Sequence, residues 1–221
     1  MDSPGLGPPA ISPEAIEFWF DFSCPYAYIA SCRRQWLADA CGRPLALRPM
    51  LLGGVFTAIG QAQNLSSVLS PPKARHNRND VVRQAAWHGV ALAPPVDHPH
   101  RTVDALRALL ACPVEAWDGV IDTFYAAYWR DSESLADRAV LHARLFALGL
   151  DADAILQRAG SEEVKAVLRD RTAAAVAAGV FGAPAFVVDG ALFWGVDRMD
   201  MVVRAAREGW DPLAGTPHFH F

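Results

Sequence analysis

The sequence predicts an α/β fold in which a long helical segment interrupts a small β-sheet. Residues 16–49 contain a β-rich run, a helical run and a second β-rich run, while residues 185–208 contain two β-rich runs followed by a helix. Between them, residues 52–179 are rich in Ala, Leu and Arg and have few runs of β-branched residues. Strands at both ends of the chain, with helices between them, define the fold class.

The N-terminal part of this pattern predicts a βαβ unit. Residues 16–21 are aromatic and end in turn-prone residues, as a short buried strand does. Pro25 fits the first turn of a helix over 26–40, because that position has no intrahelical N–H bond to lose, and Gly42 follows its end. A second strand is predicted over 45–49, and the order strand–helix–strand favours a right-handed crossover with parallel strands.

The middle segment predicts a series of helices. They are expected over residues 72–88, 102–111, 113–129, 135–148, 153–159 and 162–178. Ser134 and Asp137 resemble the start of a capping box, and Gly149 is expected just beyond the end of that helix. We expect this segment to pack as an all-helical unit.

The C-terminal part predicts a ββα unit. Asp189-Gly190 separates two β-rich runs, 185–188 and 191–194, which is a strong hairpin pattern, and a helix is expected over 197–208. A βαβ unit followed by ββα is the order of a thioredoxin fold. We therefore expect a thioredoxin-like domain from residues 14–51 and 180–210, a helical insertion domain over 52–179, a disordered leader over 1–13 and a tail over 211–221.

The composition excludes several classes of protein. Of the 221 residues, 52% are hydrophobic and 20% charged, which suits a folded core rather than a disordered chain. A net charge of −4 offers no basic face for nucleic acid, and no apolar stretch reaches the ~20 residues of a membrane span. The leader lacks signal-peptide features, and the four cysteines form neither a C-x-x-C pair nor a zinc ligand set. We expect a cytoplasmic protein with free thiols and no metal.

Cys24 is the main candidate for chemistry. It lies just before Pro25, at or beside the N-cap of the first helix, where unpaired N–H groups and the positive end of the helix dipole face its sulfur. We therefore expect a depressed pKa for its thiol. The alternatives are that Cys24 is a buried, inert residue and that Ser23, interpreted here as a turn residue, is the nucleophile. The other three cysteines are interpreted as structural: Cys32, Cys41 and Cys112.

A second candidate element is the segment that enters the third strand, Gly182-Ala183-Pro184. Pro is tolerated at the start of a strand because its missing N–H lies outside the ladder. In this fold context we expect a cis bond before Pro184. It would leave the backbone of Ala183 free to pair with an extended, peptide-like ligand.

These elements resemble a known group of proteins. The chain is similar to the DsbA-like thioredoxin superfamily and, within it, to 2-hydroxychromene-2-carboxylate isomerases and kappa-class glutathione transferases. The resemblance covers roughly residues 16 to 208 and rests on three separated motifs. These are Asp21, Phe22, Pro25, Tyr26 and Tyr28 at the first helix, Lys73, His76, Asp80 and Arg83 in the insertion, and Trp194-Gly195-Val196-Asp197-Arg198 after the hairpin.

The resemblance implies glutathione as cofactor. It implies that Cys24 holds the glutathione sulfur, that Ala183, beside Pro184, pairs with the glutathione backbone, and that Lys73 contacts the glycyl carboxylate. The remaining implied contacts are Val196 and Asp197 to the γ-glutamyl end, Gln61 or Asn64 from the preceding loop, and Asp80 and Arg198 to the glutathione of a neighbouring subunit. A homodimer is therefore implied. The charges agree, since glutathione has two carboxylates and one ammonium group.

The sequence departs from the family pattern at two positions. Cys24 stands where the family has serine, and a cysteine can form a mixed disulfide as well as donate a hydrogen bond. His76 stands where the family has tyrosine, which leaves the aromatic substrate open. A stacking pocket for that substrate is expected from Tyr26, Tyr28, His76 and Trp194, although these aromatic side chains could equally belong to the core.

Three functions follow from these features. The first is a glutathione-dependent isomerase of aromatic catabolism, in which glutathione thiolate adds transiently to an unsaturated aromatic α-keto acid. The second is a monothiol thiol–disulfide oxidoreductase, or a kappa-like glutathione transferase, that uses Cys24. Ala27 occupies the position of a resolving cysteine, so a dithiol cycle is excluded. The third is a binding protein without catalysis that keeps the fold.

Overall fold

The centre of the molecule is a four-stranded mixed sheet with the order β2-β1-β3-β4. The structure is a computed structural model and describes residues 14–63 and 68–209. β1 (Ile16–Phe20) pairs in parallel with β2 (Leu45–Pro49) and antiparallel with β3 (Ala185–Val188), which pairs antiparallel with β4 (Ala191–Trp194). The predicted leader, the tail beyond residue 209 and Asn64 lie outside the described residues. All four strands were predicted from the sequence.

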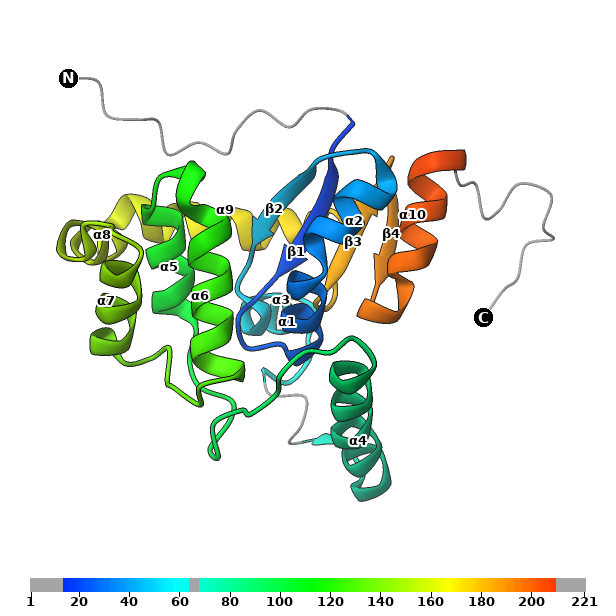
Figure 1. Cartoon of the computed structure of the whole chain (residues 1–221), viewed down its shortest axis with the longest axis horizontal. Helices are drawn as coiled ribbons and strands as arrows, with labels where there is room; N and C mark the ends of the chain where they lie inside the picture. The colour runs from blue at the N-terminus through cyan, green and yellow to red at the C-terminus, as the bar shows by residue number, and fades with distance from the viewer. Residues whose placement is uncertain (1–13, 64–67, 210–221) are drawn as a thin grey trace.

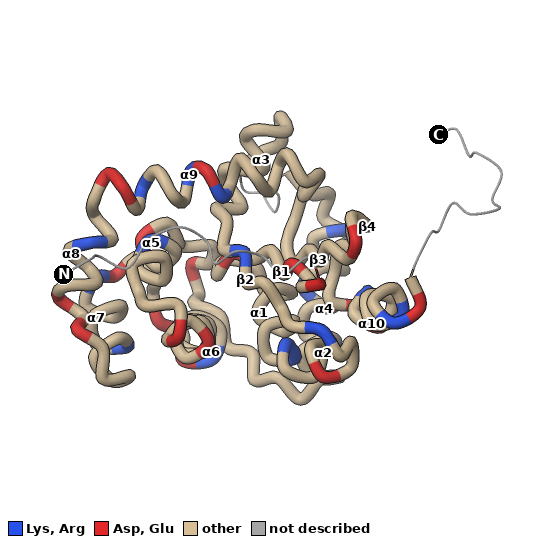
Figure 2. Tube along the Cα trace, turned by 90° about the horizontal axis from the view of Figure 1, so that it is seen from above, with Lys and Arg blue, Asp and Glu red and all other residues tan. Residues whose placement is uncertain are grey.

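The helices of the two terminal segments cover one face of the sheet (Figure 2). They are α1 (Pro25–Cys32), α2 (Arg34–Cys41) and α10 (Met199–Glu208), the last preceded by the 3-10 turn η3 (Val196–Arg198). The single helix predicted over 26–40 is therefore wrong, because the backbone leaves the helical region at Arg33 and the Arg33 N–H bonds to Ala30 O instead of the residue four back. Arg34 then restarts the helix and reaches across to Asp118 and Asp122.

The opposite face carries α3 (Leu52–Ala58) and α9 (Glu162–Ala177) (Figure 2). No helix was predicted over 52–58, because Gly53 and Gly54 disfavour one. The fold supplies the missing stability: the Leu51 N–H, at the N-cap of α3, bonds to Thr172 Oγ1 on α9 at 3.0 Å. A Cβ atom added at Gly54 would lie 3.0 Å from Thr172 Cγ2, so glycine permits the close approach of α3 to α9.

The remaining helices form a bundle beside the sheet (Figure 1). They are α5 (Val103–Ala111), the 3-10 turn η2 (Val114–Ala116), α6 (Trp117–Trp129), α7 (Arg138–Ala147) and α8 (Ala152–Ala159). The start expected at Ser134 is wrong: Asp137 is the N-cap of α7 and accepts the Ala139 N–H, while Ser134 Oγ accepts only the Ala136 N–H. Gly149 has φ 74° after the helix, as expected.

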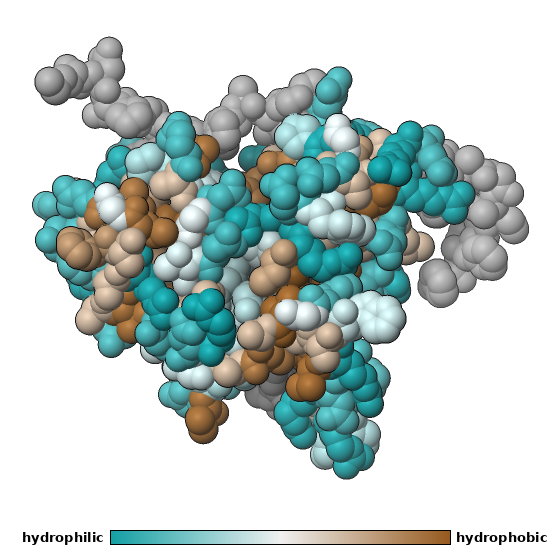
Figure 3. All heavy atoms as spheres, in the orientation of Figure 1, coloured by the Kyte–Doolittle hydropathy of each residue, from teal (hydrophilic) through white to brown (hydrophobic). Residues whose placement is uncertain are grey.

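α4 (Pro71–Trp87) is set apart from this bundle. It projects from the body of the molecule in Figure 1, and hydrophilic side chains cover most of its visible face in Figure 3. Ala85 is its one buried residue, whereas Val82 is 59% exposed and Trp87 84% exposed. Most of the surface of α4 is therefore free of contacts within the described chain.

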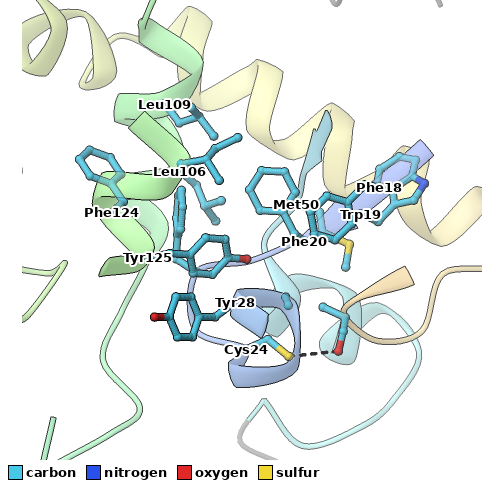
Figure 4. Packing of buried hydrophobic residues seen from close by; sticks show 14 of the residues in the cluster. Phe18, Trp19, Phe20, Cys24, Tyr28, Met50, Leu106, Leu109, Phe124 and Tyr125 are labelled. Carbon is cyan, nitrogen blue, oxygen red and sulfur yellow. Dashed lines mark hydrogen bonds between the residues drawn. The ribbon is translucent and has the colours of Figure 1, made fainter. Parts of the chain in front are cut away.

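Sheet and bundle share one apolar core (Figure 4). Phe18 stacks on Phe186 across the sheet with ring centroids 5.2 Å apart, and Phe22 meets Tyr125 of α6 at 5.0 Å. Close-packed aromatic rings leave little room for the two parts to shift independently. No helix within the described ranges is long and apolar enough to cross a bilayer.

Candidate active site

Cys24 lies where the end of β1 turns into α1. It is the N-cap of α1, with extended backbone angles, and Pro25 follows at the first helical position. Its thiol donates a hydrogen bond to the carbonyl oxygen of Ala183 at 3.0 Å, across 159 residues of chain (Figure 4). The bond between Ala183 and Pro184 is cis, as expected. The hydrogen bond from the Cys24 sulfur thus links the start of α1 to the loop before β3.

The expected depression of the Cys24 pKa is wrong. Burial of the side chain, with a smaller contribution from the carboxyl of Asp21, raises the pKa to about 12. The backbone N–H groups of Tyr26 and Ala27 lower it, in the direction that the helix N-terminus predicts, but desolvation is the larger effect. Near neutral pH the group is therefore a thiol and a hydrogen-bond donor.

The turn that carries Cys24 is fixed by a buried carboxyl. Asp21 is 1% exposed and accepts hydrogen bonds from the N–H of Leu52 at 2.7 Å, from Thr102 Oγ1 at 2.6 Å and from the N–H of Ser23 at 3.0 Å. Burial raises its pKa, against these hydrogen bonds, which lower it. Asp21 thereby joins the turn to the starts of α3 and α5. Sequence reasoning named Asp21 only as part of a motif.

Two side chains of α6 bond to the backbone of the same turn. Tyr125 Oη donates to the carbonyl oxygen of Asp21 at 3.1 Å, and Trp129 Nε1 donates to that of Phe22 at 2.8 Å. Both donors are buried. Ser23, the competing nucleophile, has its N–H on Asp21 and behaves as the turn residue that we expected.

The segment after β4 closes against the cis-proline loop. The Gly195 N–H bonds to Pro184 O at 3.0 Å, and Trp194 covers Gly182, where an added Cβ would lie only 2.5 Å from Trp194 Nε1. Trp194 also packs on Phe181 with centroids 5.0 Å apart, yet is 53% exposed. It is therefore available to a ligand at this edge.

The two charged residues that follow pair with each other. Asp197 Oδ2 lies 3.0 Å from Arg198 Nη1, and both side chains are 51% exposed. Val196 is buried, so only its backbone can face a ligand. Gly195 has φ 112°, and an added Cβ there would collide with Asp197 Oδ1. This glycine lets the chain bend so that Asp197 is presented at the surface.

Tyr26 connects these groups to α4. Its Oη donates to Asp80 Oδ2 at 2.8 Å. Burial first and then the hydrogen bond to Asp80 raise the Tyr26 pKa, and both Cys24 and Asp197 lie close enough to raise it further. Tyr26 is therefore the residue around which Cys24, Asp80 and Asp197 gather.

Other predicted site residues lie further out or elsewhere. Lys73 and His76 are exposed on α4; seven residues separate Lys73 from Asp80, about 10 Å along the helix. Gln61 is exposed after α3. Tyr28 does not belong to a substrate pocket, because it is 5% exposed and its hydroxyl donates to Ala91 O at 2.9 Å. Among residues 14–63 and 68–209, no group of three or more His, Cys, Asp or Glu could hold a metal.

Comparison with known proteins identifies the family. The model of the DsbA-like thioredoxin domain matches residues 15–207. The chain belongs to the DsbA-like thioredoxin family. This DsbA-like protein is 29% identical over 189 residues to 2-hydroxychromene-2-carboxylate isomerase of Sphingobium xenophagum, covering 86% of this chain and 96% of the relative. It is 27% identical over 223 residues to glutathione S-transferase kappa 1 of Rattus norvegicus, covering 93% and 95%.

Solved structures agree on the fold of this DsbA-like protein. A structure of 2-hydroxychromene-2-carboxylate isomerase superposes with a TM-score of 0.78 at 24% identity, covering 86% of this chain and 93% of that one. The predicted thioredoxin-like fold with a helical insertion is confirmed. The curated relatives are isomerases and glutathione transferases, so the site described above lies in a family of enzymes.

Proposed function

We propose that this protein is a glutathione-dependent isomerase that interconverts the cis and trans forms of an unsaturated aromatic α-keto acid. The observation that carries the proposal is the meeting of the Cys24 thiol with the Ala183 carbonyl at the N-terminus of α1. The Cys24 sulfur is a neutral hydrogen-bond donor, and the backbone of Ala183 beside it suits pairing with a tripeptide. The names of the two curated relatives, an isomerase and a glutathione transferase, support the same cofactor.

The residues present fit glutathione. Ala183 lies in the cis-proline loop, and no hydrogen bond to its N–H is seen within the described residues, so it can pair with a peptide ligand. Asp197 offers a half-exposed carboxylate to the γ-glutamyl ammonium group. Lys73 and Gln61 are exposed on the segments that flank this edge. The contacts of Lys73 and of Val196 with the cofactor stay predictions.

The chemistry divides between cofactor and protein. When bound, glutathione would supply a thiolate able to add reversibly to the conjugated double bond, which would permit rotation about that bond. Cys24, a thiol near neutral pH, would redirect its hydrogen bond from Ala183 O to the cofactor sulfur and would stabilise negative charge there. Trp194 and Tyr26 flank the substrate, and Asp80 holds Tyr26 in place.

The redox alternative is less well supported. A monothiol exchange needs the Cys24 thiolate as nucleophile, whereas a kappa-like transferase, in which the attacking sulfur belongs to glutathione, does not. Burial holds the pKa of this thiol near 12. Ala27 also leaves no resolving cysteine one turn along α1. Hydrogen-bond donation by a neutral thiol requires neither.

We also propose that the protein is a cytoplasmic homodimer. The four cysteines are free, which suits a reducing compartment. Val82 and Trp87 are exposed on a helix with one buried residue, and such a surface suits a partner subunit. Asp80 and Arg198 would then approach the glutathione of that neighbour. Sedimentation velocity tests the dimer: a monomer of 24.0 kDa at micromolar concentration would contradict it.

The test of the main proposal is calorimetric titration with reduced glutathione. We expect millimolar or tighter binding that is weakened by Lys73→Ala and by Asp197→Asn. Arg75→Ala is the matched control, because it removes the same charge from the same helix two residues away, on another face. Isomerisation of the α-keto acid is then followed by ultraviolet absorbance. Turnover without glutathione would refute the mechanism. Absence of glutathione binding at several millimolar would refute the assignment of glutathione as the cofactor.

A further inference from the structure

A groove of about 420 Å³ is lined by residues of α3, α5 and α9. Figure 2 shows α3 and α9 on the face of the sheet opposite α1. Its apolar wall is aliphatic throughout: Leu51, Val103, Leu168 and Val176 contribute to it, and no aromatic ring lines it among the described residues. None of the predicted site residues that the structure describes lines it. The cavity is thus a second feature, separate from the Cys24 site.

Small residues shape this groove. Gly54 forms part of the wall, where an added Cβ would lie 3.0 Å from Thr172 Cγ2, so α3 and α9 already touch at that point. Ala58 on α3 and Ala173 on α9 are exposed and leave the mouth open. The hydroxyl of Thr172 is engaged on both sides, accepting from the Leu51 N–H and donating to Leu168 O. The α3 end of the groove therefore offers apolar surface to an occupant.

The other end of the groove is cationic. Arg107, Lys165 and Arg169 line it, and no carboxylate of residues 14–63 or 68–209 does. Nε of Arg107 is buried without a hydrogen-bond partner in the described part of the chain, and the nearest carboxylate, Asp104, is 3.7 Å from Arg107 Nη1. Lys165 bonds to Glu162 at 2.8 Å. Arg107, Lys165 and Arg169 together give this end positive charge that an anion can neutralise.

Electrostatics shows that these cations converge. The pKa of Glu162 is held below its ordinary value first by the hydrogen bond from Lys165 and also by the charges of Arg169 and Arg107. Three cations therefore act on one carboxylate, which is itself 82% exposed and outside the groove. Positive charge is left over at this end.

The two ends are separated by a defined length. Arg169 and Val176 both line the groove and lie seven residues apart on α9, about 10 Å along the helix axis. We propose that this groove binds a medium-chain aliphatic carboxylate, with the carboxylate on Arg107, Lys165 and Arg169 and the acyl chain between α3 and α9. An extended chain of about eight carbons spans that length. Flexible aliphatic walls suit an acyl chain better than a planar ring.

The test uses sodium octanoate as probe and octanamide as its uncharged counterpart, both by calorimetric titration of the full chain. Ala173→Trp fills the groove and is expected to weaken octanoate binding by about tenfold or more. Ala174→Trp is the matched control, since Ala174 is also exposed on α9 but does not line the groove, and binding should be unchanged. The pair Lys165→Ala and Arg169→Ala should weaken octanoate by about fivefold or more and leave octanamide unaffected.

Several results would overturn the proposal. They are absence of octanoate binding at several millimolar, equal loss in Ala173→Trp and Ala174→Trp, and equal affinity for octanoate and octanamide. Titrations are repeated with reduced glutathione at saturation, and displacement of octanoate would place it at the Cys24 site instead. Because the variants lie outside that site, the outcome is independent of whether glutathione binds or isomerisation occurs.

Discussion

Tyr26 Oη donates a hydrogen bond to Asp80 Oδ2 at 2.8 Å, and this bond joins α1 to the projecting helix α4. α4 makes few other contacts with the body of the molecule and buries only Ala85. This bond between a phenol and a carboxylate is a side-chain link between α4 and the helix that begins after Cys24.

Loss of this bond is expected to loosen α4 without unfolding the protein. In Tyr26→Phe the ring remains and the hydroxyl is removed, so hydrogen exchange of the amides over Pro71–Trp87 should accelerate by about tenfold, for a bond worth ~1–2 kcal/mol. Tyr28→Phe is the control, because that hydroxyl bonds to Ala91 O instead. Unchanged exchange in Tyr26→Phe would show that α4 is positioned by other contacts.

The raised pKa of Cys24 has a consequence for its reactivity. In a variant that keeps only Cys24, alkylation by iodoacetamide should be slow at pH 8 and rise up to about pH 12. The stability that the buried thiol contributes is complete below the ordinary pKa of 9.0 and is lost as the pH rises through about 12. Rates are measured against the urea-unfolded variant. A plateau reached by pH 8 would show that the helix N-terminus, and not burial, dominates.

Gly182→Ala tests the contact beneath Trp194. The added methyl group would lie 2.5 Å from Trp194 Nε1, so either the indole or the cis-proline loop must move, at a cost of about 1–3 kcal/mol in unfolding free energy. In the background Trp194→Ala the same substitution should cost almost nothing. Urea unfolding of the four proteins measures this coupling. An equal cost in both backgrounds would locate the strain in the backbone.

Asp21→Asn tests the carboxyl beneath the turn. The amide can present only one oxygen to the N–H groups of Leu52 and Ser23 and to the hydroxyl of Thr102, so we expect a loss of about 2–3 kcal/mol in unfolding free energy. Because the folded pKa of Asp21 is raised, the wild type loses stability as the pH rises from about 3.8 through that pKa. The penalty of the substitution should therefore be larger at pH 4 than at pH 7. A penalty that grows with pH would contradict this sign.

Local patterns predicted the sheet well, because its information lies within short segments. The hairpin is an example: Asp189 with φ 48° and Gly190 with φ 84° form the turn that this dipeptide favours. The same holds for Pro25 after Cys24 and for Gly149 after α7, where backbone chemistry acts over one or two residues.

The sequence predictions are wrong where contacts between residues far apart in the chain determine the local structure or the pKa. The helix breaks at Arg33, just before Arg34, whose side chain bonds to Asp118 of α6. α3 forms over two glycines because Thr172 and Asp21 accept hydrogen bonds from the N–H groups at its start. The Cys24 pKa was misjudged because a helix N-terminus is visible in sequence, while burial of the thiol beneath a loop 159 residues away is not.

The hydrogen bonds from α6 to the turn before α1 make the shape of that turn independent of the side chain at position 24. Tyr125 and Trp129 bond to the carbonyl oxygens of Asp21 and Phe22, and main-chain carbonyls are present whatever side chain follows. The side chain at position 24 can therefore change while the backbone of the turn keeps its conformation. A hydroxyl or a thiol can stand at position 24 without altering the turn, so the reactive group can change in evolution while the fold is kept.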